Sequence, residues 1–189
     1  MNKLQPSGPS CVPYGNRYCA IDIGTANFAL RIEDREDYVY GECGKISSVV
    51  NDTKNFGKKG KNNIYVEIVP NLLKYLESQK SILRTCAVVI IELQINEAQM
   101  SRIEGLTVGY LCSILSPLSE VVVMGTSVKN KLIKKHFGLE GRLKREDAKK
   151  YGVELAQIII EKDEFKLKKN KTHIADTILM IECYVREIN

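Results

Sequence analysis

A short apolar stretch near the N-terminus, which contains an aspartate and turns at a glycine, constrains the fold of this chain more than any other segment. Residues 18–26 read Tyr-Cys-Ala-Ile-Asp-Ile-Gly-Thr-Ala. An apolar run this short, bounded by a glycine turn, is typical of a buried strand. A carboxylate inside a buried strand is costly unless its charge is paired or bound to a metal ion. Asp22 is therefore either a cation ligand or a structural residue that caps the following turn.

Two more acidic residues occupy comparable positions later in the chain. Five consecutive apolar residues, Ala87 to Ile91, lead directly into Glu92, and the segment His173-Ile-Ala-Asp176 opens an amphipathic helix. A ribonuclease H-like fold assembles a divalent-metal site from two strands that end in carboxylates and a late helix that carries an aspartate. The order of the three carboxylates favours a cation ligand at Asp22.

Length and composition describe a soluble globular chain. Its 189 residues, 44% hydrophobic and 27% charged, fit one domain, which we expect over residues 17–189 after a flexible tail over residues 1–16. No apolar stretch reaches the roughly 20 residues that a membrane span needs. The six cysteines form no CxxC pair, which favours a reducing intracellular compartment and argues against a structural zinc.

Positive charge is modest overall but uneven along the chain. The formal net charge is +5, and basic residues gather in residues 54–61, 129–150 and 162–171. Any one cluster is explained by a solvated surface. Together, the three clusters suggest a polyanionic partner, most simply nucleic acid.

The pattern of apolar residues predicts an α/β protein. We expect an antiparallel meander of three strands, then a polar loop, a helix that Pro70 starts or kinks, a buried strand and a long helix, followed by a further strand and three helices. The predicted strands cover residues 17–24, 28–33, 38–46, 85–93 and 120–124, the loop covers residues 51–63, and the helices cover residues 64–79, 97–115, 128–137, 145–161 and 173–188.

This order is that of the ribonuclease H-like fold, a central mixed sheet flanked by helices. The chain resembles the RuvC-type Holliday-junction resolvases, and most of all their poxvirus and large-DNA-virus branch. The resemblance lies in an ordered set of short segments between about residue 17 and residue 189. The segments are Tyr18-Cys-Ala-Ile-Asp-Ile-Gly-Thr-Ala-Asn27, Val88-Val-Ile-Ile-Glu-Leu-Gln94, Met100-Ser-Arg-Ile-Glu-Gly105, Thr126-Ser-Val-Lys129, Lys144-Arg-Glu-Asp-Ala-Lys149 and His173-Ile-Ala-Asp176.

The resemblance implies an endonuclease that resolves four-way DNA junctions and branched replication intermediates with Mg²⁺, for which Mn²⁺ is an expected substitute. It implies that Asp22 bridges two metal ions and that Glu92 and Asp176 each hold one. Lys129 corresponds to a lysine that the family places near the scissile phosphate, although it also reads as one more surface lysine of a basic helix. Thr25 and Asn27 are weaker candidates to orient Asp22 or to contact phosphate.

His173 departs from the aspartate that many family members carry. It lies three residues before Asp176, on the same helical face. Its ring could bind metal, transfer a proton, or merely begin the helix, and these three roles stay open.

The resemblance also implies a partner and a location. Because a four-way junction has two strands to nick, we expect a homodimer, formed through the helix over residues 97–115, where Gly105 and Gly109 would allow close packing. The viral branch implies work in the host cytoplasm, at viral replication sites.

Functions of other classes fit less well. Residues 21–27 resemble the first phosphate motif of sugar kinases, actin and chaperone ATPases, but a chain of this length has room for only one such lobe. A non-catalytic nucleic-acid-binding module gains nothing from carboxylates in its cleft. The remaining alternative is another ribonuclease H-like nuclease, which acts on RNA–DNA hybrids or flaps.

Overall fold

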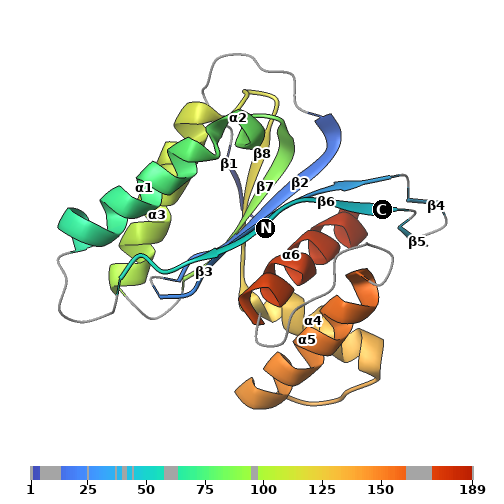
Figure 1. The fold of residues 1–189 in the computed structure, drawn as a ribbon. Helices are drawn as coiled ribbons and strands as arrows, with labels where there is room; N and C mark the ends of the chain where they lie inside the picture. The colour runs from blue at the N-terminus through green and yellow to red at the C-terminus, as the bar shows by residue number, and fades with distance from the viewer. Residues whose placement is uncertain are drawn as a thin grey trace.

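A six-stranded mixed sheet forms the centre of the molecule (Figure 1), in the order β1-β8-β7-β2-β3-β6. The structure is a computed structural model that describes residues 2–4, 14–24, 26–36, 38–39, 42–43, 45–57, 64–94, 98–160 and 172–188. The strands of this sheet are β1 (Asn2–Leu4), β2 (Tyr14–Asp22), β3 (Phe28–Arg35), β6 (Ile46–Lys54), β7 (Cys86–Glu92) and β8 (Glu120–Met124).

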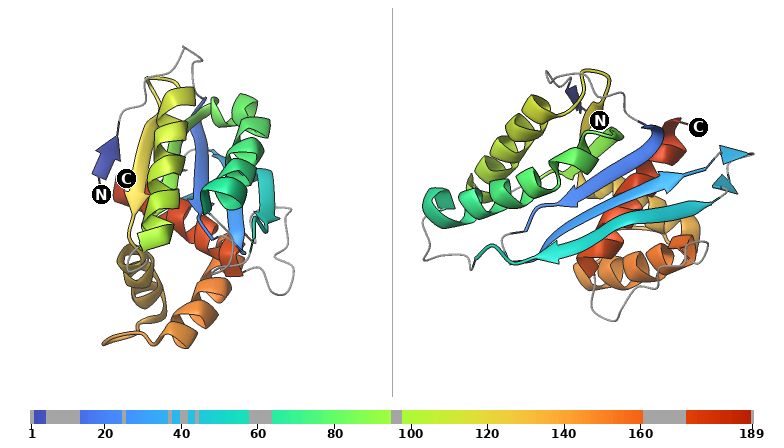
Figure 2. Two further views of the ribbon diagram at one scale, coloured as in Figure 1. Left: turned by 90° about the vertical axis from the view of Figure 1, so that its left-hand side faces the viewer. Right: turned by 45° about the horizontal axis from the view of Figure 1, so that its top comes forward.

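The sheet has a parallel half and an antiparallel half. β2, β3 and β6 form the meander, visible side by side in Figure 2, with antiparallel pairing of β2 to β3 and of β3 to β6. β7 pairs parallel with both β2 and β8. Central strands covered on both faces need apolar residues at almost every position, which explains the continuous apolar runs of β2 and β7.

Helices cover both faces of the sheet (Figures 1 and 2), and each face has its own apolar core. One layer holds the π-helix η1 (Ile64–Ile68), α1 (Val69–Ser78), α2 (Lys80–Leu83) and α3 (Ala98–Ile114), and the other holds α4 (Thr126–Phe137), α5 (Arg145–Ile160) and α6 (Thr172–Ile188). Among the described residues, no helix is both long enough and apolar enough to cross a membrane.

The predicted α/β class and the mixed sheet with its meander are confirmed, and most predicted elements lie where expected. The strand over residues 120–124 matches β8, and Pro70 lies in the first turn of α1, as its missing N–H requires. α4 ends at Gly138, whose φ of 62° is the left-handed conformation that suits a helix C-terminus.

The predicted third strand of the meander, over residues 38–46, is wrong. Its residues contribute a separate two-stranded ladder of β4 (Tyr38–Val39) and β5 (Glu42–Cys43), and the third strand is β6. β6 lies at the edge of the sheet and is mostly half-exposed, so its sequence is polar and lacks an apolar signal. For the same reason, residues 51–54 belong to β6 although we expected a loop there, and residues 58–63 of that loop lie outside the described residues.

Two strands also begin within residues 1–16, where the sequence predicted a flexible tail. Asn2–Leu4 pair antiparallel with Val121–Val123 of β8, and β2 already begins at Tyr14. A strand of three residues is too short to show an alternating sequence pattern, so β1 is recognised only by its pairing with β8.

A buried ionic network, which the sequence did not reveal, joins the sheet to α6. Arg31, Glu33 and Arg35 alternate along one face of β3, and their side chains are at most 1% exposed. Glu33 accepts hydrogen bonds from both arginines, and Arg35 donates another to Glu182 of α6. Burial by itself would raise the pKa of Glu33, but the two guanidinium groups lower it overall.

We predict that Glu33→Leu lowers the free energy of unfolding by about 3–5 kcal/mol, because it leaves two buried guanidinium groups without their shared carboxylate. Urea unfolding of both proteins measures the difference. Glu154→Gln, on the exposed face of α5, is the control and should change little. The depressed pKa of Glu33 stabilises the fold above the ordinary glutamate range, so the difference between the two proteins should shrink as the pH falls below that range and through the depressed pKa. Equal stabilities at pH 7 would contradict the prediction.

Candidate metal centre in a basic cleft

The ends of two parallel strands and the N-terminal end of α6 bring the predicted acidic residues together. The pairing of Ile21 with Ile91 places Asp22 and Glu92, the last residues of β2 and β7, beside each other. α6 begins at Thr172, so His173 lies in its first turn and Asp176 directly after that turn. Ligand atoms of Asp22, His173 and Asp176 all lie within 4.8 Å of one another.

Asp22 is buried at the centre of this group and contacts His173. The Nδ1 atom of His173 lies 2.7 Å from Oδ2 of Asp22, whose residue is only 7% exposed. Burial raises the pKa of Asp22 to about 7, the hydrogen bond to His173 lowers it in part, and Glu92 and Asp176 add repulsion that raises it. The same hydrogen bond raises the pKa of His173. The pair therefore holds protons that can be exchanged near neutral pH.

Lys129 joins the other two carboxylates. Its Nζ atom lies 2.8 Å from Oε1 of Glu92 and 2.8 Å from Oδ1 of Asp176. The residue is 3% exposed, and although burial would lower its pKa, the two carboxylates raise it overall. Burial would likewise raise the pKa of Glu92, but the Lys129 ammonium lowers it overall. The ammonium is therefore a fixed positive charge, and a surface location for Lys129 is excluded.

Thr126 is a further contributor that sequence reasoning did not single out. Its Oγ1 donates a hydrogen bond of 3.1 Å to Oε1 of Glu92, the same oxygen that Lys129 contacts. Thr126 begins α4 directly after β8, whose Met124 pairs with Glu92. Its spacing of three residues from Lys129 places both side chains on one helical face, which is the signal that could have identified it.

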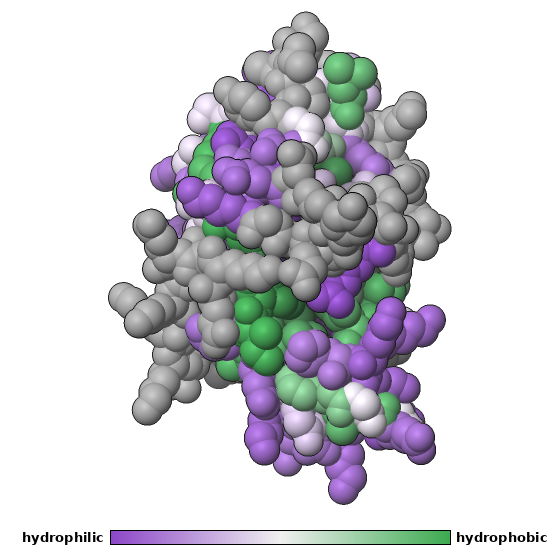
Figure 3. All heavy atoms as spheres, turned by 90° about the vertical axis from the view of Figure 1, so that its right-hand side faces the viewer, coloured by the Kyte–Doolittle hydropathy of each residue, from purple (hydrophilic) through white to green (hydrophobic). Residues whose placement is uncertain are grey.

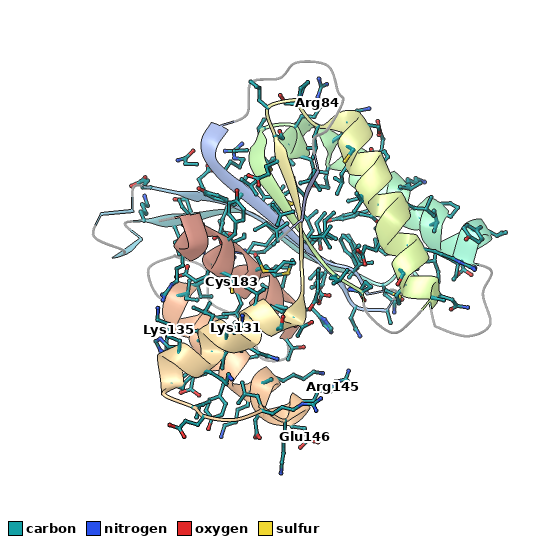
Figure 4. All side chains as sticks on the ribbon, turned by 180° about the vertical axis from the view of Figure 1, so that it is seen from behind. Arg84, Lys131, Lys135, Arg145, Glu146 and Cys183 are labelled. Carbon is teal, nitrogen blue, oxygen red and sulfur yellow. The ribbon has the colours of Figure 1, made fainter. Side chains whose placement is uncertain are left out.

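All five predicted site residues line one cleft of about 670 Å³, which α4, α5 and the turn between them complete. Five further basic side chains line the same cleft, namely Lys131, Lys134, Arg142, Arg145 and Lys149. Figure 4 shows Lys131 on α4 and Arg145 at the beginning of α5, and Figure 3 shows hydrophilic side chains along the part of the molecule where α4 and α5 lie. Part of the basic cluster over residues 129–150 thus lines the cleft together with the carboxylates, whereas residues 58–61 and 162–171 lie outside the described residues.

The donor set suits a hard divalent cation. Asp22 and Asp176 offer carboxylate oxygens, which Mg²⁺ and Mn²⁺ prefer, and His173 adds a nitrogen, which Mn²⁺ accepts more readily than Mg²⁺. The acidic residues outnumber the buried ammonium, so added positive charge would be favourable. The residues present therefore fit a metal ion.

The weaker predictions around Asp22 have a different outcome. Thr25 lies outside the described residues, and Asn27 is exposed and is not among the residues that line the cleft. The backbone of Asn27 nevertheless constrains the turn, because a Cβ atom at Gly24 would lie 2.8 Å from its carbonyl oxygen. The glycine after the strand is therefore required by this close approach.

Comparison with known proteins identifies the fold but no sequence family. No family model and no curated protein sequence matches the chain. Thermus thermophilus RuvC superposes with a TM-score of 0.60 at 13% identity, over 91% of this chain and 95% of that one. The fold is that of RuvC. 

Two other solved structures share this RuvC fold. The yeast mitochondrial Holliday junction resolvase Ydc2 matches with a TM-score of 0.58 at 14% identity, over 94% of this chain and 82% of that chain. A fowlpox virus resolvase, solved with its substrate Holliday junction DNA, matches with a TM-score of 0.58 at 19% identity, over 91% of this chain and 98% of that one. In each case the similarity spans at least 91% of this chain and at least 82% of the other.

We predict that Thr126→Val raises the pKa of Glu92, because the hydroxyl donates a hydrogen bond to the charged carboxylate and helps to lower that pKa. Carbon-detected NMR of the glutamate carboxyl signals against pH measures the shift. Thr126→Ser keeps the hydroxyl and serves as the matched control. An unchanged titration of Glu92 in the valine variant would show that this hydrogen bond does not stabilise the carboxylate.

Proposed function

We propose that this protein is a metal-dependent endonuclease that resolves four-way DNA junctions by paired hydrolysis of phosphodiester bonds. One observation carries the proposal. On a RuvC fold, Asp22, Glu92 and Asp176 converge from β2, β7 and α6 at a cleft that basic side chains also line. Carboxylates that hold cations and a wall that attracts phosphate are both needed to cut a nucleic-acid backbone.

The residues of the cleft have distinct tasks in this reaction. Asp22, Asp176 and His173 would hold a divalent ion, which would supply an activated water near neutral pH and Lewis-acid stabilisation. The Lys129 ammonium lies within the same cluster and can stabilise negative charge that develops on a phosphate. Lys131, Arg142 and their neighbours bind the flanking backbone and orient it across the cleft.

Nδ1 of His173 and Oδ2 of Asp22 lie within hydrogen-bond distance of each other. Because the pKa of Asp22 is raised to about 7, the carboxylate becomes fully available as a ligand only above neutral pH or when a cation displaces the proton. We therefore infer that His173 acts as a metal ligand or as a proton carrier. Of the three roles that the sequence left open, the contact with Asp22 disfavours the one in which it merely begins the helix.

The decisive experiment compares substrates. Purified protein with Mg²⁺, and separately with Mn²⁺, is incubated with a synthetic four-way junction, a linear duplex, a flap and an RNA–DNA hybrid. We expect cleavage of the junction in preference to the other three. Equal cutting of all four would overturn the proposal, and preferential cutting of the hybrid or flap would support the alternative of another ribonuclease H-like nuclease.

We predict that Asp22→Asn, Glu92→Gln and Asp176→Asn each reduce junction cleavage by orders of magnitude, because each removes a ligand charge and preserves side-chain shape. Junction binding should persist or strengthen, since repulsion between the carboxylate and the backbone is relieved. Gel-shift and cleavage assays on each variant measure both effects. Glu154→Gln, which is exposed on α5 and is not among the residues that line the cleft, should cleave normally. Retained cleavage by Glu92→Gln would remove Glu92 from the site.

We also propose a homodimer formed through α3, so that two active sites can nick a junction symmetrically. Leu106 is 41% exposed on this helix, and neither Gly105 nor Gly109 has an atom within 4 Å of where a Cβ would lie. Tyr110 also lies on α3, but it is less suitable as a dimer contact, because its hydroxyl already donates a hydrogen bond to Glu77 of α1. These features support a flat surface on α3 that a second copy could approach closely.

We predict that Leu106→Asp yields monomers, because the dimer would bury an unpaired charge. Light scattering at micromolar concentration measures the oligomeric state, and a junction assay distinguishes single from paired nicks. Arg102→Asp, also exposed on α3 and one turn earlier, tests how far the contact extends. A monomeric wild-type protein, even with junction bound, would contradict the dimer.

We further infer that the protein belongs to the viral branch of these enzymes and works at replication sites in the host cytoplasm. The likeness to the fowlpox virus resolvase over nearly its entire length supports this origin. Among the described residues, Cys19, Cys86, Cys112 and Cys183 form no disulfide bond, which is consistent with a reducing compartment.

A further inference from the structure

Lys129 occupies a place in the cleft that a cation would be expected to favour. Its ammonium lies between two carboxylate oxygens from different elements, Oε1 of Glu92 and Oδ1 of Asp176, at 2.8 Å from each. Two negatively charged oxygens that converge on one point form the kind of position that attracts a divalent ion. A lysine that fills this position is therefore in direct competition with such an ion.

The distribution of ligand atoms agrees with this competition. Among the described residues, the group of donor atoms within 4.8 Å of one another comprises Asp22, His173 and Asp176, and Glu92 is not part of it. Both Lys129 and Thr126 hold Oε1 of Glu92. Asp176 therefore belongs both to this group of donor atoms and to the pair of carboxylates that Lys129 contacts. Glu92 contacts Lys129 and Thr126 instead.

We propose that Lys129 and a divalent cation compete for Glu92 and Asp176, and that a DNA phosphate in the cleft draws the lysine away and thereby strengthens cation binding. This inference rests on the proposed function, because it takes the phosphate from a DNA substrate. Lys129 then contributes twice, first by holding two carboxylates together without metal and then by contacting the phosphate. The protein would assemble its full cation site only when substrate is present.

The cleft permits the exchange. Lys129 lines the cleft with a side chain that is only 4% exposed, and its two partners are more open, with Glu92 13% and Asp176 34% exposed. Its long flexible stem can move the ammonium without moving α4. Lys131 and Arg145 at the same cleft would hold the neighbouring backbone while the ammonium changes partner.

Reciprocity makes the competition measurable. If DNA binding increases the affinity for the cation by some factor, cation binding must increase the affinity for DNA by the same factor. Removal of the lysine should abolish most of this coupling, because the carboxylates are then available to the cation from the beginning.

The test is a Mn²⁺ titration of the protein without DNA, followed by electron paramagnetic resonance of unbound Mn²⁺. Lys129→Met should bind Mn²⁺ at least about tenfold more tightly than wild type, because a positive charge beside two ligand oxygens is removed. Lys131→Met removes the same charge from the same cleft but not from these oxygens, so its affinity should change far less. Lys129→Arg keeps the charge and should remain close to wild type.

Two outcomes of this titration would overturn the proposal. One is a Lys129→Met affinity equal to or weaker than that of wild type, and the other is an equal gain in Lys131→Met, which would reduce the effect to general charge. If Lys129→Met does not fold, NMR of the lysine ammonium signals in wild type replaces it, with Lys129→Arg providing the assignment. The Lys129 signal should then shift on addition of Mg²⁺, and an unperturbed signal at saturating Mg²⁺ would also overturn the proposal.

The coupling is tested with Ca²⁺ and a four-way junction by calorimetry. The junction should tighten Ca²⁺ binding by wild type and should do so much less for Lys129→Met, whereas equal tightening in both would contradict the release of the lysine by phosphate. Failure of the competition is distinguishable from failure of the proposed function. If wild type cleaves junctions but shows no competition between Lys129 and the cation, only the competition is refuted. If it shows the competition but does not cleave junctions, only the proposed function is refuted.

Discussion

The parallel pairing of β2 with β7 is the constraint on which the candidate site depends. Its register places Ile21 beside Ile91, so that Asp22 and Glu92 emerge together at one end of the sheet. A shift by one residue would turn one of these carboxylates to the other face, because side chains alternate along a strand. The central residues of the two strands, Cys19–Ile21 and Val88–Ile91, are buried and pack alternately against the two helical layers, which holds both strands in the core.

The position of α6 completes the site and has its own anchor. His173 and Asp176 lie near the N-terminal end of α6, and Glu182, further along the helix, accepts a hydrogen bond from Arg35 of β3. Because this ion pair is buried and specific in direction, it selects one placement of the helix on the sheet. The ionic network in the core therefore serves the orientation of metal-ligand candidates that lie about 9 Å (Asp176) and about 13 Å (His173) away along the helix, at about 1.5 Å per residue.

Charge balance links the cleft to its proposed substrate. Three carboxylates converge in the cleft, and the ammonium of Lys129 and the hydrogen bond between Asp22 and His173 offset their charge only in part. Basic side chains line the same cleft, so it can accept a polyanion and cations together. A site that contained only one sign of charge could not hold both. This arrangement explains why a buried lysine is tolerated beside residues that resemble metal ligands.

Much of the fold and of the candidate site could be predicted from local sequence. Apolar runs that end in Asp22 and Glu92 predicted β2 and β7, and helical periodicity predicted α3 and α6, since burial on both faces or along one stripe leaves a clear pattern. β6 was misplaced, because an edge strand needs little apolar surface, and β1 was missed, because three residues carry no period. The sequence determined which residues carry charge and which segments are buried. Only the tertiary structure decided that Thr126 bonds Glu92, that Lys129 lies between two carboxylates and that Arg31, Glu33 and Arg35 are buried, because these depend on contacts between distant segments that no local pattern encodes.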